Sequence, residues 1–147
     1  MCIGGITVNN PRPVGQTAAA GFQVGVRRTF PIPVLEAWKL ITSPKGLSIW
    51  LGEGGPIDVE VGQLFQTEEG ISGEFRVVNE LENLRLSWTA EHWAKSSTLQ
   101  IRTIPAGDHK TTISFHQEKL SGPDVREAMK RRWEDVLGRL QGICEEA

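Results

Sequence analysis

The side chains that could carry chemistry are few and lie far apart in the chain. The sequence has two cysteines, Cys2 and Cys144, and three histidines, His92, His109 and His116. A metal site is expected to show closely spaced ligands, such as a Cys-x-x-Cys pair or two histidines four residues apart on a helix. Because no such spacing occurs, the sequence predicts no metal site.

Motifs of covalent and phosphate chemistry are also missing from the sequence. The glycine-rich stretch GEGGP at 52–56 lacks the lysine and the strand–loop–helix context of a phosphate loop, so we interpret it as a turn. The chain has no G-x-S-x-G nucleophile elbow, and it has no tyrosine to act as an acid–base donor. We therefore assign no catalytic residue and no cofactor. These observations favour a protein without catalytic activity, although they leave an enzyme open.

Two polar residues fall on alternating positions where apolar residues are expected. Arg28 shares its parity with Val26 and Phe30, where an unpaired guanidinium would be costly. It either anchors an anionic ligand head, or reaches the sheet edge or a glutamate, and we favour the second interpretation. His92 continues the inward parity of Trp88. It either lines the mouth of a cavity or belongs to a loop, and the loop is favoured.

The elements that must position these side chains follow from apolar periodicity. Alternation from Phe22 to Phe30 predicts a strand with one buried face, and the prolines of the next segment end it. Helical spacing then predicts a short helix to about Thr42 and a second one over SPKGLSIWL at 43–51. Further alternating runs predict strands at 57–61, 64–67, 71–77, 84–88, 98–102 and 112–116.

The last predicted element is a long amphipathic helix. Ser121 is a suitable N-cap, and apolar residues then recur at steps of three and four up to Cys144. At about 1.5 Å per residue this helix would be roughly 30 Å long. Its other side is charged, and neighbouring carboxylates balance the basic run Lys130–Arg132, so we interpret this side as a solvated face.

Strands joined by short connections form an antiparallel sheet, and one apolar face of such a sheet needs cover. The long helix is the only predicted element large enough to provide that cover. The sequence therefore predicts an α+β fold.

Composition limits the class of protein further. The chain of 147 residues has the length of one ordinary domain, and its net charge of −2 argues against a general nucleic-acid binder or an attraction to anionic membranes. No apolar run reaches the length of a membrane span, and the N-terminal residues do not resemble a signal peptide. We expect a cytoplasmic protein with reduced thiols, as a monomer or a homodimer.

Several of these segments together resemble a known family. RRTFPIPVLEAWKLITSPKGLSIWL at 27–51, the predicted meander, TTISFHQEKL at 111–120 and a helix centred on Trp133 are similar to the SRPBCC (START-like) superfamily. The closer resemblance is to the branch named after the C-terminal domain of the activator of a heat-shock chaperone ATPase. The resemblance implies a helix-grip fold, in which a curved antiparallel sheet of about six to seven strands wraps around the long C-terminal helix. Residues 1–20 combine turn formers and small residues without a period, so we expect an irregular N-terminal arm there, followed by a single START-like domain at 21–147.

Members of this superfamily often hold an apolar cavity between sheet and helix. The resemblance therefore suggests binding of a small hydrophobic molecule, a lipid or an aromatic compound, in that space. Arg28 or His92 would orient a polar end of the ligand. The apolar contacts would come from the inward rings, which are Trp50, Phe65, Phe75, Trp88, Phe115 and Trp133. The same rings could instead fill a dry core, and the sequence does not decide between the two.

Two other functions remain open at this point. The family name suggests a protein-interaction module that binds a chaperone partner. Some relatives in the superfamily are polyketide cyclases or dehydratases, which would make the chain an enzyme.

Overall fold

A seven-stranded antiparallel sheet and three helices make up the computed structural model, which describes residues 16–17 and 21–146. In chain order the elements are β1 (Gln16–Thr17), β2 (Gly21–Phe30), α1 (Val34–Thr42), α2 (Pro44–Trp50), β3 (Leu64–Gln66), β4 (Ile71–Asn79), β5 (Asn83–Ala90), β6 (Ser97–Pro105), β7 (Thr111–Leu120) and α3 (Pro123–Glu146). The predicted α+β helix-grip architecture is confirmed, with two short helices after the first long strand.

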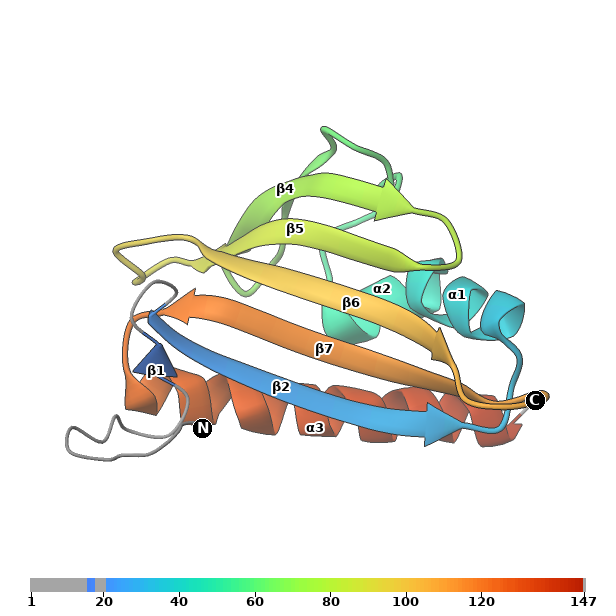
Figure 1. The fold of residues 1–147 in the computed structure, drawn as a ribbon. Helices are drawn as coiled ribbons and strands as arrows, with labels where there is room; N and C mark the ends of the chain where they lie inside the picture. The colour runs from blue at the N-terminus through green and yellow to red at the C-terminus, as the bar shows by residue number, and fades with distance from the viewer. Residues whose placement is uncertain (1–15, 18–20, 147) are drawn as a thin grey trace, which may run out of the picture.

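The strands are ordered β1-β2-β7-β6-β5-β4-β3, so the first long strand lies beside the last one. From β3 to β7 the chain forms a meander in which each strand pairs with the next. The two short helices occupy the connection that carries the chain from β2 at one side of the sheet to β3 at the other. All three helices lie on the same side of the sheet (Figure 1). One sheet face is therefore covered and the other is open.

The covered face is built by the alternation that the sequence predicted. In β7, Ile113 and Phe115 are fully buried, whereas the alternate residues Thr112, Ser114 and His116 are partly exposed. In β6 the same alternation buries Leu99 and Ile101. Side chains at alternate positions of a strand point to opposite faces of the sheet, so these apolar residues form one continuous core surface.

Helix α3 covers that surface with one apolar stripe. The buried residues of the stripe are Met129, Trp133, Val136, Leu137 and Leu140. Two polar contacts fix the helix along β2: Arg126 Nε donates to the carbonyl of Gln23 at 2.8 Å, and Arg28 Nη1 donates to Gln141 Oε1 at 2.9 Å. The side chains of α3 therefore meet the inward side chains of the strands, as the periodicity predicted.

Helices α1 and α2 form a compact corner beside α3 on the covered face of the sheet (Figure 1). Pro33 precedes α1, and the Ser43 side chain caps α2 by accepting from the backbone N–H of Gly46 at 3.1 Å. The indole Nε1 of Trp50 then donates to the carbonyl of Ile41 at 2.7 Å. This bond joins the two helices and orients the Trp50 ring towards the sheet.

Two expectations about local structure need correction. The strand predicted at 57–61 does not form, although Ile57 and Val59 pack against the core as partly buried residues. The segment makes no ladder with the edge strand β3 and runs as an irregular connection. Within the arm predicted to be irregular, Gln16–Thr17 instead pairs with β2, and the rest of 1–20 lies outside the described residues. None of the described helices is both long and apolar enough to cross a membrane.

Candidate ligand-binding site

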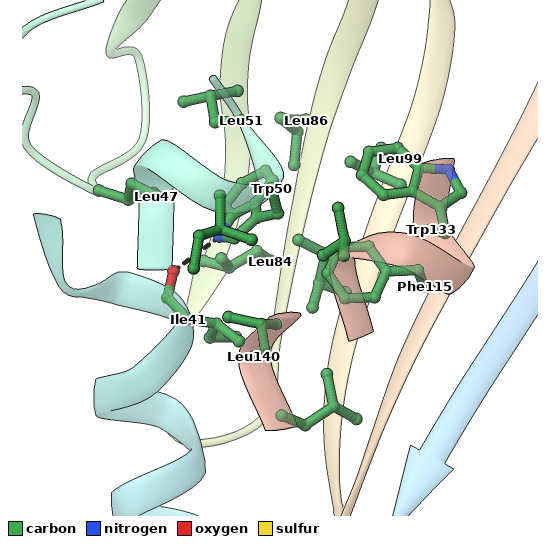
Figure 2. Close-up of a cluster of buried hydrophobic side chains, with 14 of the residues drawn as sticks. Ile41, Leu47, Trp50, Leu51, Leu84, Leu86, Leu99, Phe115, Trp133 and Leu140 are labelled. Atoms are coloured by element: carbon green, nitrogen blue, oxygen red, sulfur yellow. Dashed lines mark hydrogen bonds between the residues drawn. The ribbon is translucent and has the colours of Figure 1, made fainter. Parts of the chain in front are cut away.

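The six rings predicted to supply apolar contacts come together in one cluster between the sheet and the helices. Phe115 stacks on Trp133 with ring centroids 5.0 Å apart, and Trp88 meets Trp133 edge-on at 5.2 Å. Trp50 makes edge contacts with Phe115 at 6.3 Å and with Phe75 at 6.4 Å. Phe65 extends the cluster through a tilted contact with Phe75 at 5.7 Å. Figure 2 shows Trp50, Phe115 and Trp133 surrounded by leucine and isoleucine side chains.

These rings are packed against one another and shielded from solvent. Five of the six have no exposed surface, and only Phe65 retains a small exposed fraction of 6%. Aromatic pairs at such distances and angles contribute about 0.5–1.5 kcal/mol each beyond their area burial. The space between sheet and α3 is thus occupied by side chains, and solvent reaches the cluster only at Phe65.

A short polar chain crosses this apolar core. The indole Nε1 of Trp133 donates to Gln117 Oε1 at 2.9 Å, and Gln117 Nε2 donates to Ser97 Oγ at 2.9 Å. Ser97 Oγ donates in turn to the carbonyl of Trp88 at 2.7 Å. Gln117 is completely buried, so its amide must be bonded inside the protein to be tolerated there. The chain fixes the Trp133 ring relative to β6 and β7.

An open cleft of about 290 Å³ lies where Phe65 reaches the surface. One wall is α2 with the segment that follows it, and the opposite wall is β3. The cleft is lined by Pro44, Leu47, Ser48, Leu51, Gly52, Glu53, Gly54, Gly55, Pro56, Ile57, Phe65, Gln66 and Thr67. Leu47, Leu51 and Phe65 are buried members of the core, so the floor of the cleft is the outer surface of that core. A small apolar molecule in the cleft would make hydrophobic contacts with this floor.

A second hollow, about 440 Å³ and more polar, adjoins the cleft on the side of α3. Both hollows are lined by Ser48, Gly52 and Glu53, so they meet along this strip. Gly52 has a φ of +121°, and a Cβ at this position would lie 3.1 Å from Glu69 Oε1. A side chain at Gly52 would crowd Glu69, so glycine leaves the boundary between the two hollows open.

Arg132 of α3 clamps the elements around this second hollow. Its guanidinium forms a fork onto Glu69, with Nη2 at 2.9 Å from Oε1 and Nη1 at 3.3 Å from Oε2. Nη2 also approaches the carbonyls of Trp50 and Leu51, at 3.4 and 3.5 Å. One side chain thereby joins α3, the end of α2 and the turn before β4.

The Arg132 guanidinium also covers two rings of the cluster. Its central carbon lies 4.9 Å from the ring centroid of Trp88 and 5.5 Å from that of Trp133, which are cation–π distances. The interpretation of the Lys130–Arg132 run as a solvated face is wrong for Arg132, whose side chain is only 22% exposed. At 3.6 residues per turn, the first and third of three consecutive residues lie about 200° apart around the helix, so one of them can face inward.

The two predicted polar ligands lie away from the cleft. Arg28 is partly buried against α3, where its partner is the amide of Gln141 rather than a glutamate. His92 is exposed in the turn after β5, as the favoured loop interpretation predicted. Neither residue lines the cleft, and of the six rings only Phe65 does. Among the described residues, no group of three or more histidine, cysteine or carboxylate side chains is placed to hold a metal ion.

The model of the family described as "Activator of Hsp90 ATPase homolog 1-like protein" matches residues 31–145. No curated protein sequence shows recognisable similarity to the chain.

Solved structures share the fold at low sequence identity. PFC0360w, an HSP90 activator from Plasmodium falciparum, is 19% identical with a TM-score of 0.73, over 84% of this chain and 96% of that one. CalU16 from Micromonospora echinospora is 21% identical with a TM-score of 0.72, over 85% of this chain and 76% of that one. DynU16, a protein in the dynemicin biosynthetic locus, is 21% identical with a TM-score of 0.67, over 84% of this chain and 47% of that one.

Proposed function

The chain belongs to the family of Activator of Hsp90 ATPase homolog 1-like proteins, and from this membership we propose that it binds a small hydrophobic molecule without transforming it. The proposed site is the cleft between α2, the segment 51–57 and β3. We include in this proposal the cytoplasmic location that the sequence predicts.

The observation that carries the proposal is the apolar floor of the cleft. Leu47, Leu51 and Phe65 are core residues whose outer surfaces meet the cleft, and Ile57 closes it from the irregular segment. The volume of about 290 Å³ lies near the lower end of the range for small-molecule sites. The ligand expected from this size is compact, such as a medium-chain lipid or a single aromatic ring system.

The ring cluster behind the cleft supports the site without lining most of it. Trp50, Phe75, Trp88, Phe115 and Trp133 have no exposed surface, so a ligand in the cleft touches Phe65 and reaches the others only if side chains move. In this proposal the five buried rings give Phe65 and Leu51 a rigid backing. Arg28 and His92 have no part in it, because they lie outside the cleft.

The test uses a neutral fluorescent probe, N-phenylnaphthylamine, whose emission rises in apolar surroundings. We expect the protein to enhance its emission and expect Ile57→Trp, which fills the cleft, to weaken binding about ten-fold. The matched control is Val59→Trp, two residues further in the same partly buried segment but outside the cleft lining. It should bind the probe as the native protein does. Equal binding by all three proteins, or no binding by the native protein, would exclude this site.

A second candidate function is that of a co-chaperone module, which the family name and the structural likeness to PFC0360w favour. It predicts binding to the chaperone through an exposed surface and does not need the cleft. The discriminating measurement is the ATPase rate of an Hsp90-type chaperone with and without the protein. A raised rate that is equal for the native protein and Ile57→Trp would favour this function over ligand binding.

An enzyme of the polyketide cyclase kind is the third candidate, and the likeness to a protein in a biosynthetic locus keeps it open. Among the residues that line the cleft, Glu53 is the only carboxylate, and no histidine, lysine or cysteine accompanies it. The cleft therefore offers one exposed acid–base group rather than a positioned pair, which places this candidate behind the other two.

A further inference from the structure

The open face of the sheet carries a group of arginines that the cleft does not explain. Arg27 of β2 and Arg102 of β6 both pair with Ser114 of β7, one from each side. In the next row across the sheet, Arg85 of β5 pairs with Gln100, which pairs in turn with His116. We call the three residues Arg27, Arg85 and Arg102 the arginine triad.

The side chains of the triad point away from the core. Leu84 and Leu86, on either side of Arg85, are fully buried, and Ile101 beside Arg102 is fully buried as well. Because strand side chains alternate between faces, the arginines between them project from the opposite face, and all three are exposed. The helices leave this face uncovered (Figure 1).

No carboxylate neutralises the triad within its two rows. The other members of these rows are Ser114, Asn83, Asn79, Gly25, His116, Gln100 and Val77. Arg85 Nη2 donates to Gln100 Oε1 at 3.1 Å, but none of the three arginines forms an ion pair with a described residue. The nearest acid along β7 is Glu118, which pairs with Thr98 one row further on.

This concentration of positive charge contrasts with the rest of the molecule. The chain as a whole has a net charge of −2. On the side of α3, the hollow clamped by Arg132 is lined by four carboxylates, Glu53, Glu68, Glu69 and Asp135, against two arginines. Three basic side chains without an ion pair therefore lie together on this part of the open sheet face, whereas the hollow on the side of α3 carries an excess of carboxylates. Such a field attracts and orients an acidic partner.

We infer that the open sheet face is a docking surface for an acidic segment of a partner protein. Arg27 and Arg102 are two strands apart, which places their Cα atoms about 10 Å from each other. Guanidinium groups bind carboxylates in a two-pronged manner, and the serine, asparagine and glutamine between them add hydrogen bonds to the partner backbone. The contact would be wet, polar and weak without an additional anchor.

The same rows argue against a nucleic acid as the partner. Their only aromatic side chain is the imidazole of His116, which already contacts Gln23 Oε1 at 3.1 Å, whereas single-strand affinity usually comes from several stacking rings. A duplex would need more phosphate contacts than three arginines provide in a protein of net negative charge. A short acidic segment needs neither stacking rings nor many cationic contacts.

The experiment titrates the protein with a peptide of alternating glutamate and serine at low ionic strength, followed by amide NMR shifts. We expect shifts confined to the two rows and weaker binding as salt is added. Arg27→Gln combined with Arg102→Gln should weaken the affinity about ten-fold, as expected for the loss of two exposed charge pairs. The matched control, Lys95→Gln with Arg131→Gln, changes the net charge equally through two exposed residues outside the rows. It should bind within about two-fold of the native protein.

Three results would overturn the inference. One is equal weakening by the control, because binding would then follow net charge alone. Another is no binding by the native protein, or equal binding of a glutamine–serine peptide. The third is tighter, triad-dependent binding of a single-stranded oligonucleotide or of phosphatidylserine vesicles, which would assign the face to another class of partner. None of these results bears on the cleft, since the probe assay is independent of the triad.

Discussion

Gln117 is a polar residue whose role is set by its surroundings. Its amide accepts from Trp133 and donates to Ser97, so both ends of the side chain are bonded within the core. A bridge of this kind specifies one arrangement of rings, because a rotated Trp133 would leave its N–H without an acceptor. The residue therefore contributes orientation as well as stability.

We expect Gln117→Leu to lower the free energy of unfolding by about 1–3 kcal/mol, because the buried indole N–H of Trp133 loses its acceptor. Urea unfolding measures this change. The control is Gln100→Leu, a glutamine on the open face, which should stay within about 0.5 kcal/mol of the native value. A similar loss of unfolding free energy in both variants would show that the buried bridge stabilises the protein no more than an exposed glutamine does.

The inward rings were predictable at the residue scale, but the buried polar groups were only partly so. Phe75, Trp88 and Phe115 follow the alternation of their strands, and their burial confirms that prediction. Gln117 lies two residues after Phe115 on the same inward side of β7, so its burial could have been predicted from the alternation. The burial of Arg132 was harder to predict, because a run of three basic residues does not show which of them turns towards the sheet.

At the scale of elements, the junction of β3, β4 and β5 depends on a missing side chain. A Cβ added at Gly73 would overlap the carbonyl oxygen of Ser87 on β5 and would lie 2.7 Å from the Phe65 ring on β3. Glycine lets Phe65 lie flat over β4 at the edge of the cleft. The position of the cleft wall therefore follows from the absence of a methyl group at this residue.

We expect Gly73→Ala to lower the free energy of unfolding by about 2–3 kcal/mol and to weaken binding of the neutral probe, because Phe65 must move. Gly25→Ala is the matched control, since the nearest side-chain atom to a Cβ there is 3.7 Å away on His116. Chemical denaturation and the probe assay measure the two effects. Native behaviour of Gly73→Ala in both assays would contradict the close packing at this junction.

The elements themselves were largely predictable, and the exceptions have physical causes. The long helix and the meander follow from strong periodicity. The alternation of Ile57, Val59 and Val61 also fits a segment that packs two apolar side chains against the core without pairing, and the structure contains such an irregular segment. The alternation of apolar residues along one segment does not show whether that segment will pair with another strand. The position of the cleft depends on that same irregular segment, and so the sequence did not indicate it.

At the scale of the whole molecule, a single core joins all layers. Trp133 of α3 contacts Trp88 of β5 and Phe115 of β7, and Trp50 of α2 contacts Phe115 and Phe75. No layer can separate without exposing rings that belong to the others. Domains of this size with one shared core usually unfold in an all-or-none manner.

We therefore expect urea unfolding monitored by far-ultraviolet circular dichroism and by tryptophan fluorescence to give the same midpoint. The first signal reports backbone structure, and the second reports the ring cluster together with Trp38 and Trp93. A fluorescence transition at lower urea would show that the cluster loosens before the sheet, and would contradict the shared core.

The order of the elements along the chain has a consequence for biosynthesis. Helix α3 follows every strand in the sequence, yet it covers the apolar face to which β2 contributes from the start. During translation, that face therefore stays uncovered until the last helix has emerged from the ribosome. Because β2 pairs with β7, the sheet itself can close only late in the synthesis of this domain, and the apolar side chains of the emerging strands stay exposed to solvent until then.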